Sequence, residues 1–163
     1  MTDQLTFEID TEDDLKKVFL PLAEVLHAGD ILTLTGALGA GKSAFARHLI
    51  RHINSDIGEV PSPTFTILQS YDTPEFPVWH FDLYRLKAPE EALELDLEEA
   101  FSSALSLIEW SDRLGPYLPP SHLDIQLEII CSKEGTQRRI TLIPSGDWVE
   151  RLQSLKHDFW KSA

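Results

Sequence analysis

The sequence predicts a three-layer α/β fold, in which a central parallel sheet lies between helices and is extended by an antiparallel hairpin. Short apolar runs typical of buried strands alternate along the chain with segments of helical periodicity, which favours parallel strands joined through helices. Near the C-terminus, two further runs flank a glycine-containing turn, as the strands of a hairpin do. Because the 163 residues contain no internal repeat and no low-complexity linker, we expect one domain over 1–163.

The first half of the chain contains two strand–helix pairs. Apolar and polar residues alternate at 5–9, whereas the run at 31–35 lacks strict alternation, as expected of a strand that is covered on both faces. Thr11 precedes three acids and can cap a helix, after which apolar residues recur at helical spacing. The predicted elements are a strand at 5–9, a helix from Thr11 towards a stop at Gly29 with a kink at Pro21, a strand at 31–35 and a helix at 42–53.

The second half of the chain opens with a loop that contains prolines and glycine. Residues 88–112 carry acids but no Lys or Arg, and we expect short helices followed by a strand there. The clearest alternation of apolar and polar residues in the chain lies at 123–129. The predicted elements are strands at 65–71, 78–83 and 105–109, hairpin strands at 123–129 and 138–143, and a C-terminal helix marked by Trp148, Leu152, Leu155 and Phe159.

The charge balance limits what the chain can bind by itself. Fourteen Lys and Arg against twenty-seven Asp and Glu give a formal net charge of −13. Phosphate backbones and anionic lipid surfaces are bound mainly by clustered basic side chains, so we expect no direct binding of nucleic acid or of a membrane. The sole cysteine, Cys131, excludes an internal disulfide and indicates a reducing compartment, and no apolar run is long enough to span a bilayer. A cytoplasmic location is therefore expected.

Residues 36–43, with the sequence Gly-Ala-Leu-Gly-Ala-Gly-Lys-Ser, fit the pattern G-x-x-x-x-G-K-[ST]. Glycines let backbone N–H groups surround phosphate oxygens, and the helix that follows points its positive N-terminal end at the same place. Lys42 can reach the terminal phosphates, and the Ser43 hydroxyl can bind magnesium. Since an apolar strand precedes the pattern and a helix follows it, we predict a P-loop NTPase fold. The predicted phosphate-binding residues are Leu38, Gly39, Ala40, Gly41, Lys42 and Ser43.

Two carboxylates and a threonine are candidates for the chemistry. Open α/β sheets bind ligands at the carboxyl ends of their strands, where Asp82 and Glu109 are expected. One acid would help to hold magnesium and the other would orient the attacking water, and the sequence leaves open which does which. Thr64, in the loop before the next strand, could add its hydroxyl to the magnesium ligands. We therefore predict Lys42, Thr64, Asp82 and Glu109 as catalytic residues, and Ser43, Asp82 and Glu109 as metal ligands.

Four motifs occur together in the chain. They are Gly36 to Ser43, Ser62-Pro63-Thr64-Phe65, His80-Phe81-Asp82-Leu83-Tyr84-Arg85 and Glu109-Trp110. In order and spacing they resemble TsaE, also called YjeE, a family of small bacterial P-loop ATPases required for threonylcarbamoyladenosine modification of tRNA. The resemblance runs from about Gly29 to Trp110 and continues more weakly through the hairpin.

This resemblance implies a function and a set of partners. It implies a magnesium-dependent ATP hydrolase that uses ATP and Mg²⁺. It also implies that the chain acts with the TsaD and TsaB proteins, which transfer the threonylcarbamoyl group to adenosine 37 of ANN-decoding tRNAs. Given the net charge of −13, we expect contact with tRNA to be made mainly by these partners.

Individual positions take expected roles from the resemblance. Thr64 matches a nucleotide-responsive loop, and the segment around Thr11 is implied to contact the nucleotide base. The chain departs from the family pattern at Ala37, where Asp is usual, and at Asp96, where Gly is usual. The positions implied to serve phosphate, magnesium and hydrolysis are Lys42, Ser43, Asp82 and Glu109.

Other functions fit the same loop. A GTPase is disfavoured, because the only asparagine, Asn54, is not followed by the lysine of an N-K-x-D motif. A small-molecule kinase remains an alternative, as does a non-hydrolysing assembly module in which ATP only orders the Thr64 loop. Two roles also stay open. His80 either is structural or positions Asp82 or a phosphate, and Arg85 either neutralises transferring charge or pairs with neighbouring acids.

Overall fold

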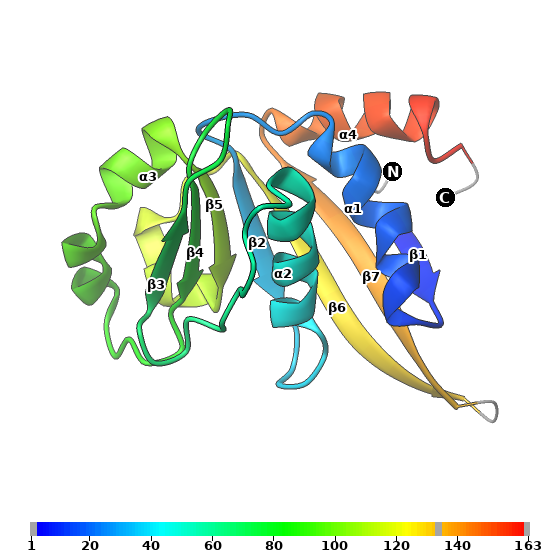
Figure 1. Ribbon diagram of the computed structural model, residues 1–163, viewed down its shortest axis with the longest axis horizontal. Helices are drawn as coiled ribbons and strands as arrows, with labels where there is room; N and C mark the ends of the chain where they lie inside the picture. Colours follow the sequence, from blue (N-terminus) through cyan, green and yellow to red (C-terminus); the bar gives the residue numbers. More distant parts are fainter. Residues whose placement is uncertain (1–2, 133–134, 162–163) are drawn as a thin grey trace.

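The computed structural model describes residues 3–132 and 135–161, which form one seven-stranded sheet with helices on both sides (Figure 1). The strand order across the sheet is β1-β7-β6-β2-β5-β4-β3. The predicted α/β class is confirmed. The strands are β1 (Leu5–Ile9), β2 (Ile31–Thr35), β3 (Leu68–Tyr71), β4 (Val78–Asp82), β5 (Leu105–Glu109), β6 (His122–Ser132) and β7 (Gly135–Ser145).

The strand directions divide the sheet into a parallel centre and antiparallel edges. Strands β6, β2, β5 and β4 run parallel to one another, and β7 pairs antiparallel with β6. The predicted hairpin extension is therefore confirmed, although its turn at 133–134 lies outside the described residues. Strand β1 pairs antiparallel with β7, and β3 pairs antiparallel with β4 at the other edge. The parallel strands bring their C-terminal ends to one edge, where open α/β sheets bind ligands.

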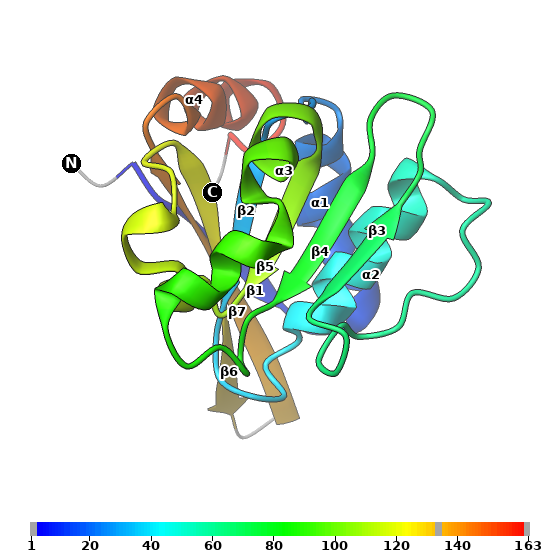
Figure 2. The same ribbon diagram turned by 90° about the vertical axis from the view of Figure 1, so that its left-hand side faces the viewer.

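Helices cover both faces of the sheet (Figures 1 and 2). Helices α1, α2 and α4 pack on one face, and α3 packs with the 3-10 segments η2 and η3 on the other. Consecutive residues of β2 enter opposite cores, Ile31 on the α3 side and Leu32 on the α2 side, which explains the absence of alternation in this strand. No helix in the described ranges has both the length and the apolar character needed to cross a bilayer. The helical elements are η1 (Glu12–Leu15), α1 (Lys16–Ala23), α2 (Lys42–Ile53), η2 (Pro89–Leu95), α3 (Leu97–Ser103), η3 (Ser111–Tyr117) and α4 (Trp148–Asp158).

The first helix is shorter than the helix predicted from Thr11 to Gly29. It begins as η1 and ends at Ala23, two residues after Pro21. Proline has no N–H for the carbonyl four residues earlier, which belongs to Lys17. The Trp160 indole donates to that carbonyl instead, at 2.8 Å. A side chain that follows α4 thus satisfies the oxygen that Pro21 leaves free.

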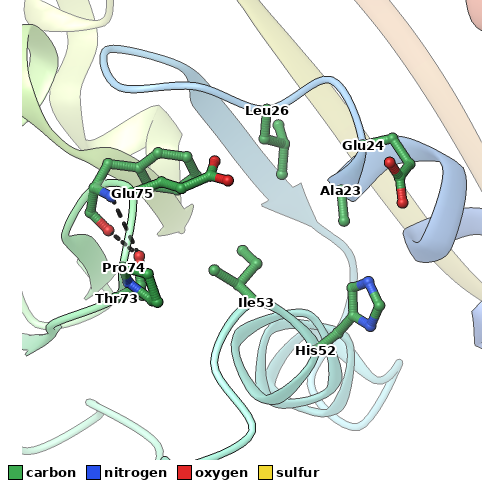
Figure 3. Close-up of a pocket in the computed structure, with 9 residues that line it drawn as sticks. Ala23, Glu24, Leu26, His52, Ile53, Thr73, Pro74 and Glu75 are labelled. Carbon is green, nitrogen blue, oxygen red and sulfur yellow. Dashed lines mark hydrogen bonds between the residues drawn. The ribbon is translucent and has the colours of Figure 1, made fainter.

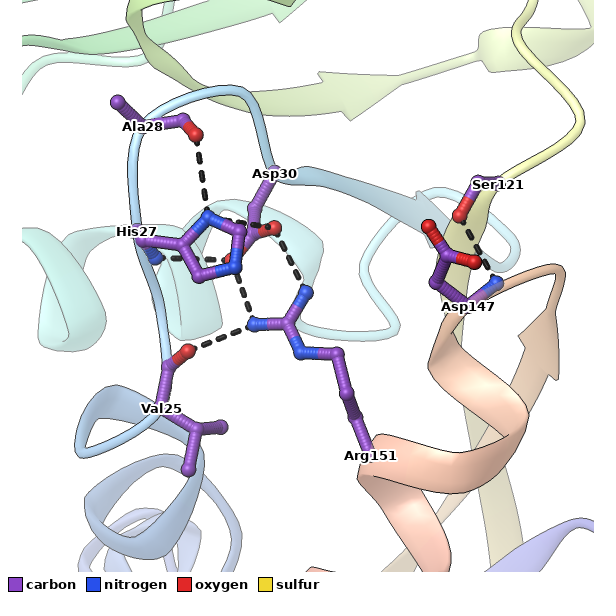
Figure 4. A network of polar contacts seen from close by, with 7 residues as sticks. All are labelled: Val25, His27, Ala28, Asp30, Ser121, Asp147 and Arg151. Atoms are coloured by element: carbon purple, nitrogen blue, oxygen red, sulfur yellow. Dashed lines mark hydrogen bonds and ion pairs between the residues drawn. The ribbon is translucent and has the colours of Figure 1, made fainter.

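A buried ion pair fixes α4 against the start of β2 (Figure 4). Arg151 donates to both carboxylate oxygens of Asp30 at 2.7 Å and to the carbonyl of Val25 at 2.6 Å. The backbone N–H of His27 donates to the same carboxylate at 2.8 Å. The Arg151 guanidinium also lies 3.8 Å from the centroid of the Trp148 ring. Since Asp30 is only 5% exposed, its charge depends on these partners.

Glu91 caps the start of η2, and this makes a pH-dependent contribution to stability. Its carboxylate accepts the backbone N–H groups of Lys87 and Ala88 at 2.5 and 3.2 Å, and these bonds hold the pKa of Glu91 below its usual value of 4.5. A carboxyl whose pKa is lower in the folded chain than in the unfolded chain stabilises the fold at pH values above its unfolded pKa. This stabilisation is lost as the pH falls through its folded pKa. Glu91→Ala is therefore expected to lower the free energy of unfolding at about pH 7 and to lower it less at about pH 3, as measured by urea denaturation. An equal loss at both pH values would contradict the prediction.

Candidate functional site

The loop at 36–41 joins the end of β2 to the start of α2, at the edge where the parallel strands end (Figure 1). Strands β5 and β4 follow β2 across the sheet, and Asp82 pairs in register with Glu109 at their ends. The loop, these two acids and Thr64 border a cavity of about 230 Å³. Its lining residues are Leu38, Gly39, Gly41, Lys42, Ser43, Ala44, Thr64, Asp82, Glu109 and Trp110.

Two glycines of the loop occupy positions that a larger residue would not fit. A Cβ atom at Gly36 would lie 2.4 Å from the carbonyl oxygen of Leu127 on β6, so a side chain there would push the loop off the sheet. Gly41 has φ +109° directly before α2, a conformation that other residues rarely adopt. Ala37, where the family pattern has Asp, accepts the N–H of Ala40 at 3.0 Å through its carbonyl. The turn therefore closes by backbone bonds, without a carboxylate at this position.

Lys42 is the first residue of α2, and its ammonium turns back over the loop. Its Nζ donates to the carbonyl of Gly36 at 2.6 Å and lies 4.3 Å from the centroid of the Trp110 ring. The residue is 6% exposed. An ammonium has three N–H donors, and Gly36 is the hydrogen-bond acceptor found for it among the described residues. The other donors can therefore serve an anion in the cavity.

Glu109 is held between the loop and a buried histidine. The Ser43 hydroxyl lies 3.3 Å from Oε1 and 3.4 Å from Oε2 of this carboxylate. On the other side, His80 Nε2 lies 2.7 Å from Oε2. Glu109 and His80 are 3% and 1% exposed. The sequence left open whether His80 is structural or positions Asp82 or a phosphate, and the structure places it against Glu109.

Asp82 is held by the loop that contains Thr64. The Thr64 hydroxyl donates to Oδ2 of Asp82 at 3.0 Å, and the backbone N–H of Tyr84 donates to Oδ1 at 3.1 Å. The Ser62 hydroxyl lies 2.8 Å from that of Thr64. The two acids therefore belong to different clusters, Asp82 with the Thr64 loop and Glu109 with Ser43 of the P-loop.

The Thr64 loop ends in a strained residue. Ile67 has φ +68°, a left-handed conformation that is strongly disfavoured for a β-branched side chain. It is held there because its N–H donates to the carbonyl of Pro63 at 2.6 Å and its own carbonyl accepts the N–H of Asp82 at 2.8 Å. This turn delays the start of β3 to Leu68, so the strand is shorter than predicted, and it ties the loop to β4.

Two other non-glycine residues in the described part of the chain also have positive φ. Trp110, with φ +60°, directly follows Glu109, and its ring packs at 5.0 Å between centroids from the ring of Tyr84. Asp96, with φ +54°, separates η2 from α3. Glycine, the residue that the resemblance implies at this position, adopts such a conformation without strain.

Most of the predicted site residues come together. Ala40 differs, because its side chain is fully buried in the core and it is not among the residues that line the cavity. Thr11 is not among the residues that line the cavity. It precedes η1, where its N–H donates to Asp14 at 3.1 Å, and its role at a nucleotide base stays a prediction. The predicted residues that line the cavity are Leu38, Gly39, Gly41, Lys42, Ser43, Thr64, Asp82 and Glu109.

Arg138 on β7 is a candidate that sequence reasoning missed. Its Nε is buried and has no hydrogen-bond partner within residues 3–132 and 135–161. It lies 3.7 Å from the position that a Cβ would take at Gly41. The sequence shows an arginine in a hairpin strand but does not show that the hairpin pairs with β2. A position for this arginine beside the P-loop could therefore not be predicted. An unpaired guanidinium nitrogen beside the loop suits a phosphate oxygen.

A separate cavity of about 260 Å³ lies at the far end of α2 from the P-loop (Figure 3). His52 and Ile53 line it from α2, and Ala23 lines it from α1. On the remaining side, Thr73 closes the β3–β4 turn by hydrogen bonds with the backbone of Phe76. This cavity shares no lining residue with the cavity at the P-loop, and the four predicted catalytic residues line the P-loop cavity instead.

The side chains around the P-loop cavity suit magnesium and phosphate. Their oxygen atoms come from two hydroxyls and two carboxylates, which are the ligand types that Mg²⁺ prefers. In the part of the chain that the structure describes, no three His, Cys, Asp or Glu side chains form a metal cluster. Such a site suits Mg²⁺, which commonly takes one or two protein ligands together with water and phosphate oxygens. The oxygen-bearing side chains are Ser43, Thr64, Asp82 and Glu109.

The site has the four features that define a P-loop protein. They are a buried parallel strand, a glycine-rich loop, a helix that begins with Lys-Ser, and acids at the ends of the next two strands across the sheet. The crystal structure of Bacillus subtilis YdiB has this architecture. It superimposes with a TM-score of 0.77 at 29% sequence identity, over 97% of this chain and 98% of that one. The predicted P-loop fold is confirmed.

The chain belongs to the TsaE family. The family profile "Threonylcarbamoyl adenosine biosynthesis protein TsaE" matches residues 9–140. A protein of Rickettsia felis is 39% identical over 146 residues, which are 90% of this chain and 85% of that protein. One of Bacillus subtilis is 31% identical over 159 residues, 95% of this chain and 96% of that protein. Both are named tRNA threonylcarbamoyladenosine biosynthesis protein TsaE, so the resemblance seen in the sequence is confirmed, and this family acts in tRNA modification.

Proposed function

We propose that this chain is a magnesium-dependent ATPase that supports tRNA N6-threonylcarbamoyladenosine modification together with TsaD and TsaB, in the cytoplasm. The observation that carries the proposal is the meeting of Lys42, Ser43, Glu109 and Asp82 around one cavity at the end of the parallel strands. Family membership supports the pathway, and the net charge of −13 favours contact with tRNA through partners.

The two acids take different roles in this proposal. Glu109 lies against Ser43, the hydroxyl expected to bind magnesium, so Glu109 belongs on the cation side of the cavity. Asp82 shares a hydrogen bond with Thr64 on the other side, where it can accept a proton from water and orient it. Bound Mg²⁺ would neutralise charge on the phosphates. The proposal thus assigns one role to each acid, where the sequence left the choice open.

Lys42 and the loop bind the phosphates and stabilise charge. Its Nζ already donates to Gly36 within the loop, so the ammonium is held in place before a nucleotide arrives. No arginine is among the described residues that line the cavity. Arg85 lies outside the lining, with its guanidinium carbon 4.7 Å from the centroid of the Phe65 ring. Arg138 lies beside Gly41 but is also outside the lining, so we expect slow hydrolysis by the isolated chain, because a positive charge supplied by an arginine at the reacting phosphate accelerates phosphoryl transfer strongly.

A rim of exposed apolar side chains is formed by Leu38, which lines the cavity, and by Phe65 and Tyr84, which adjoin lining residues. Leu38 is 74% exposed, Phe65 is 78% exposed and Tyr84 is 48% exposed. Leu38 lines the cavity, Phe65 follows Thr64, and Tyr84 packs on Trp110. Apolar groups that gather on a surface favour contact with another protein. This rim supports the proposal that partner proteins dock over the nucleotide.

Phosphate release tests the proposal directly. ATP is supplied to the chain alone, with TsaD and TsaB, and with small-molecule phosphate acceptors. Slow release of phosphate that the two partners accelerate is the expected result. ATP-dependent phosphorylation of an added acceptor would identify a kinase instead. ATP-dependent complex formation without any phosphate release would identify the assembly module, and either result would overturn the ATPase proposal.

Phe65→Ser is expected to reduce the acceleration by partners about tenfold, since it removes an exposed aromatic anchor, and to change the rate of the isolated chain by less than about twofold. Phe159→Ser is the matched control, because Phe159 is also exposed, at 55%, but follows α4 at a distance from the loop in sequence and fold. Equal acceleration of wild type and Phe65→Ser would exclude this rim as the contact.

A further inference from the structure

His80 is a buried polar residue that contacts Glu109 of the candidate site. It lies in the middle of β4, is 1% exposed and pairs in register with Leu107. Its Nε2 lies 2.7 Å from Oε2 of Glu109. Its Nδ1 is buried without a hydrogen-bond partner in the described part of the chain. One ring nitrogen is therefore engaged with Glu109, and the other is enclosed without a partner.

These contacts select one tautomer of the neutral ring. With its proton on Nε2, the ring donates to Glu109, and Nδ1 carries a lone pair rather than an N–H group. With its proton on Nδ1, the ring would bury an N–H group without an acceptor, which is unfavourable, and would place two lone pairs opposite each other at 2.7 Å. His80 therefore donates through Nε2.

This hydrogen bond fixes the orientation of the Glu109 carboxylate. His80 Nε2 lies 2.7 Å from Oε2, and the Ser43 hydroxyl lies 3.3 Å from Oε1 and 3.4 Å from Oε2, so the carboxylate presents both oxygens to Ser43 while His80 holds one of them. A carboxylate that is free to rotate would lose orientational freedom when it binds a cation, whereas one that is already hydrogen-bonded loses less. Groups that hydrogen-bond to a metal ligand from behind commonly change metal affinity by about 10–100-fold.

We propose that His80 is a positioning residue that holds the Glu109 carboxylate facing the Ser43 hydroxyl, so that the carboxylate and the hydroxyl are ready for a divalent cation that arrives with the nucleotide. His80 acts through Glu109 and touches neither the cation nor the nucleotide. The inference rests on the proposed function, in which Ser43 and Glu109 lie on the cation side of the cavity.

The test measures cation binding rather than turnover. Mn²⁺ is titrated, with detection by electron paramagnetic resonance, into protein that is saturated with a non-hydrolysable ATP analogue. His80→Ala is expected to weaken Mn²⁺ binding by about 10–100-fold. His80→Gln is expected to stay within about threefold of wild type, because its amide N–H can reach Glu109 from a similar position. Affinity for the analogue without divalent cation should be nearly unchanged in both variants.

The control is a second histidine–carboxylate pair. His157 Nδ1 lies 3.1 Å from Oδ1 of Asp158 on the surface at the end of α4, so His157→Ala removes the same kind of contact away from the cavity and should leave Mn²⁺ binding unchanged. If His80→Ala does not fold, as judged by thermal unfolding, His80→Leu keeps the volume without a donor and gives the same comparison.

The outcomes separate the two proposals. Wild-type Mn²⁺ affinity in His80→Ala or His80→Leu, or a His80→Gln variant as weak as these, would overturn the positioning role while leaving the ATPase proposal intact. Absence of Mn²⁺ binding by the wild-type complex would overturn the proposed magnesium site itself.

Discussion

Replacing Lys42 with alanine is expected to lower kcat/KM for ATP hydrolysis by about 10²–10³-fold, since one positioned charge contributes about 3–4 kcal/mol to a transition state of this kind. The ammonium is buried, bonded to Gly36 at 2.6 Å and set above Trp110, so it is held in one place at the cavity. No solvent-exposed lysine can replace a group placed in this way. Phosphate release under saturating magnesium measures the effect.

Two further variants make the Lys42 result specific. Lys42→Met keeps much of the aliphatic volume and removes the charge, and it should lose as much activity as Lys42→Ala. Lys156→Ala removes an exposed lysine from α4 and should have no effect. Circular dichroism should show the same helix content in all of these variants. Full hydrolysis by a folded Lys42→Met protein would refute the role assigned to the ammonium.

Arg151→Ala is expected to lower the free energy of unfolding by about 3 kcal/mol, because it leaves a buried carboxylate without its cation. Arg151 is bonded to both oxygens of Asp30 at 2.7 Å and also to the carbonyl of Val25 (Figure 4). Asp30 is 5% exposed, so water cannot replace these bonds fully. Urea denaturation measures the loss. Asp30 lies before β2 and the P-loop lies after it, so the ion pair and the candidate site are at opposite ends of this strand. ATP hydrolysis by the folded fraction should therefore be unchanged.

A double-mutant cycle separates the ion pair from the packing of Arg151 on Trp148. Asp30→Asn added to Arg151→Ala should cost less than the sum of the two single changes, by about 2 kcal/mol, since neither buried charge then remains. Arg139→Ala is the surface control. Arg139 pairs with exposed Glu8 at 3.0 Å, and its loss should cost less than about 1 kcal/mol. Equal costs for Arg139 and Arg151 would contradict the prediction.

Elements with strong local patterns were predicted closely. The predicted ranges of β1, β2, β5 and α2 agree with the structure, because each is bounded by a turn, a glycine or a cap that lies next to it in the sequence. Two of the differences involve contacts that are remote in sequence. Helix α1 ends at Ala23, and Trp160 bonds the carbonyl that Pro21 leaves free in it; Asp82 holds Ile67 in the left-handed turn that delays β3. Neither partner could be found from the local sequence.

The sequence by itself determined the P-loop, because its glycines, Lys42 and Ser43 are contiguous and the backbone around them is shaped by neighbouring residues. It also indicated Asp82 and Glu109, since the ends of parallel strands meet at one edge of a sheet. Only the tertiary structure decided which acid joins Ser43 and which joins Thr64, that His80 holds Glu109, and that Arg138 reaches Gly41. These contacts join positions far apart along the chain, so strand order and register, rather than local spacing, bring the side chains together.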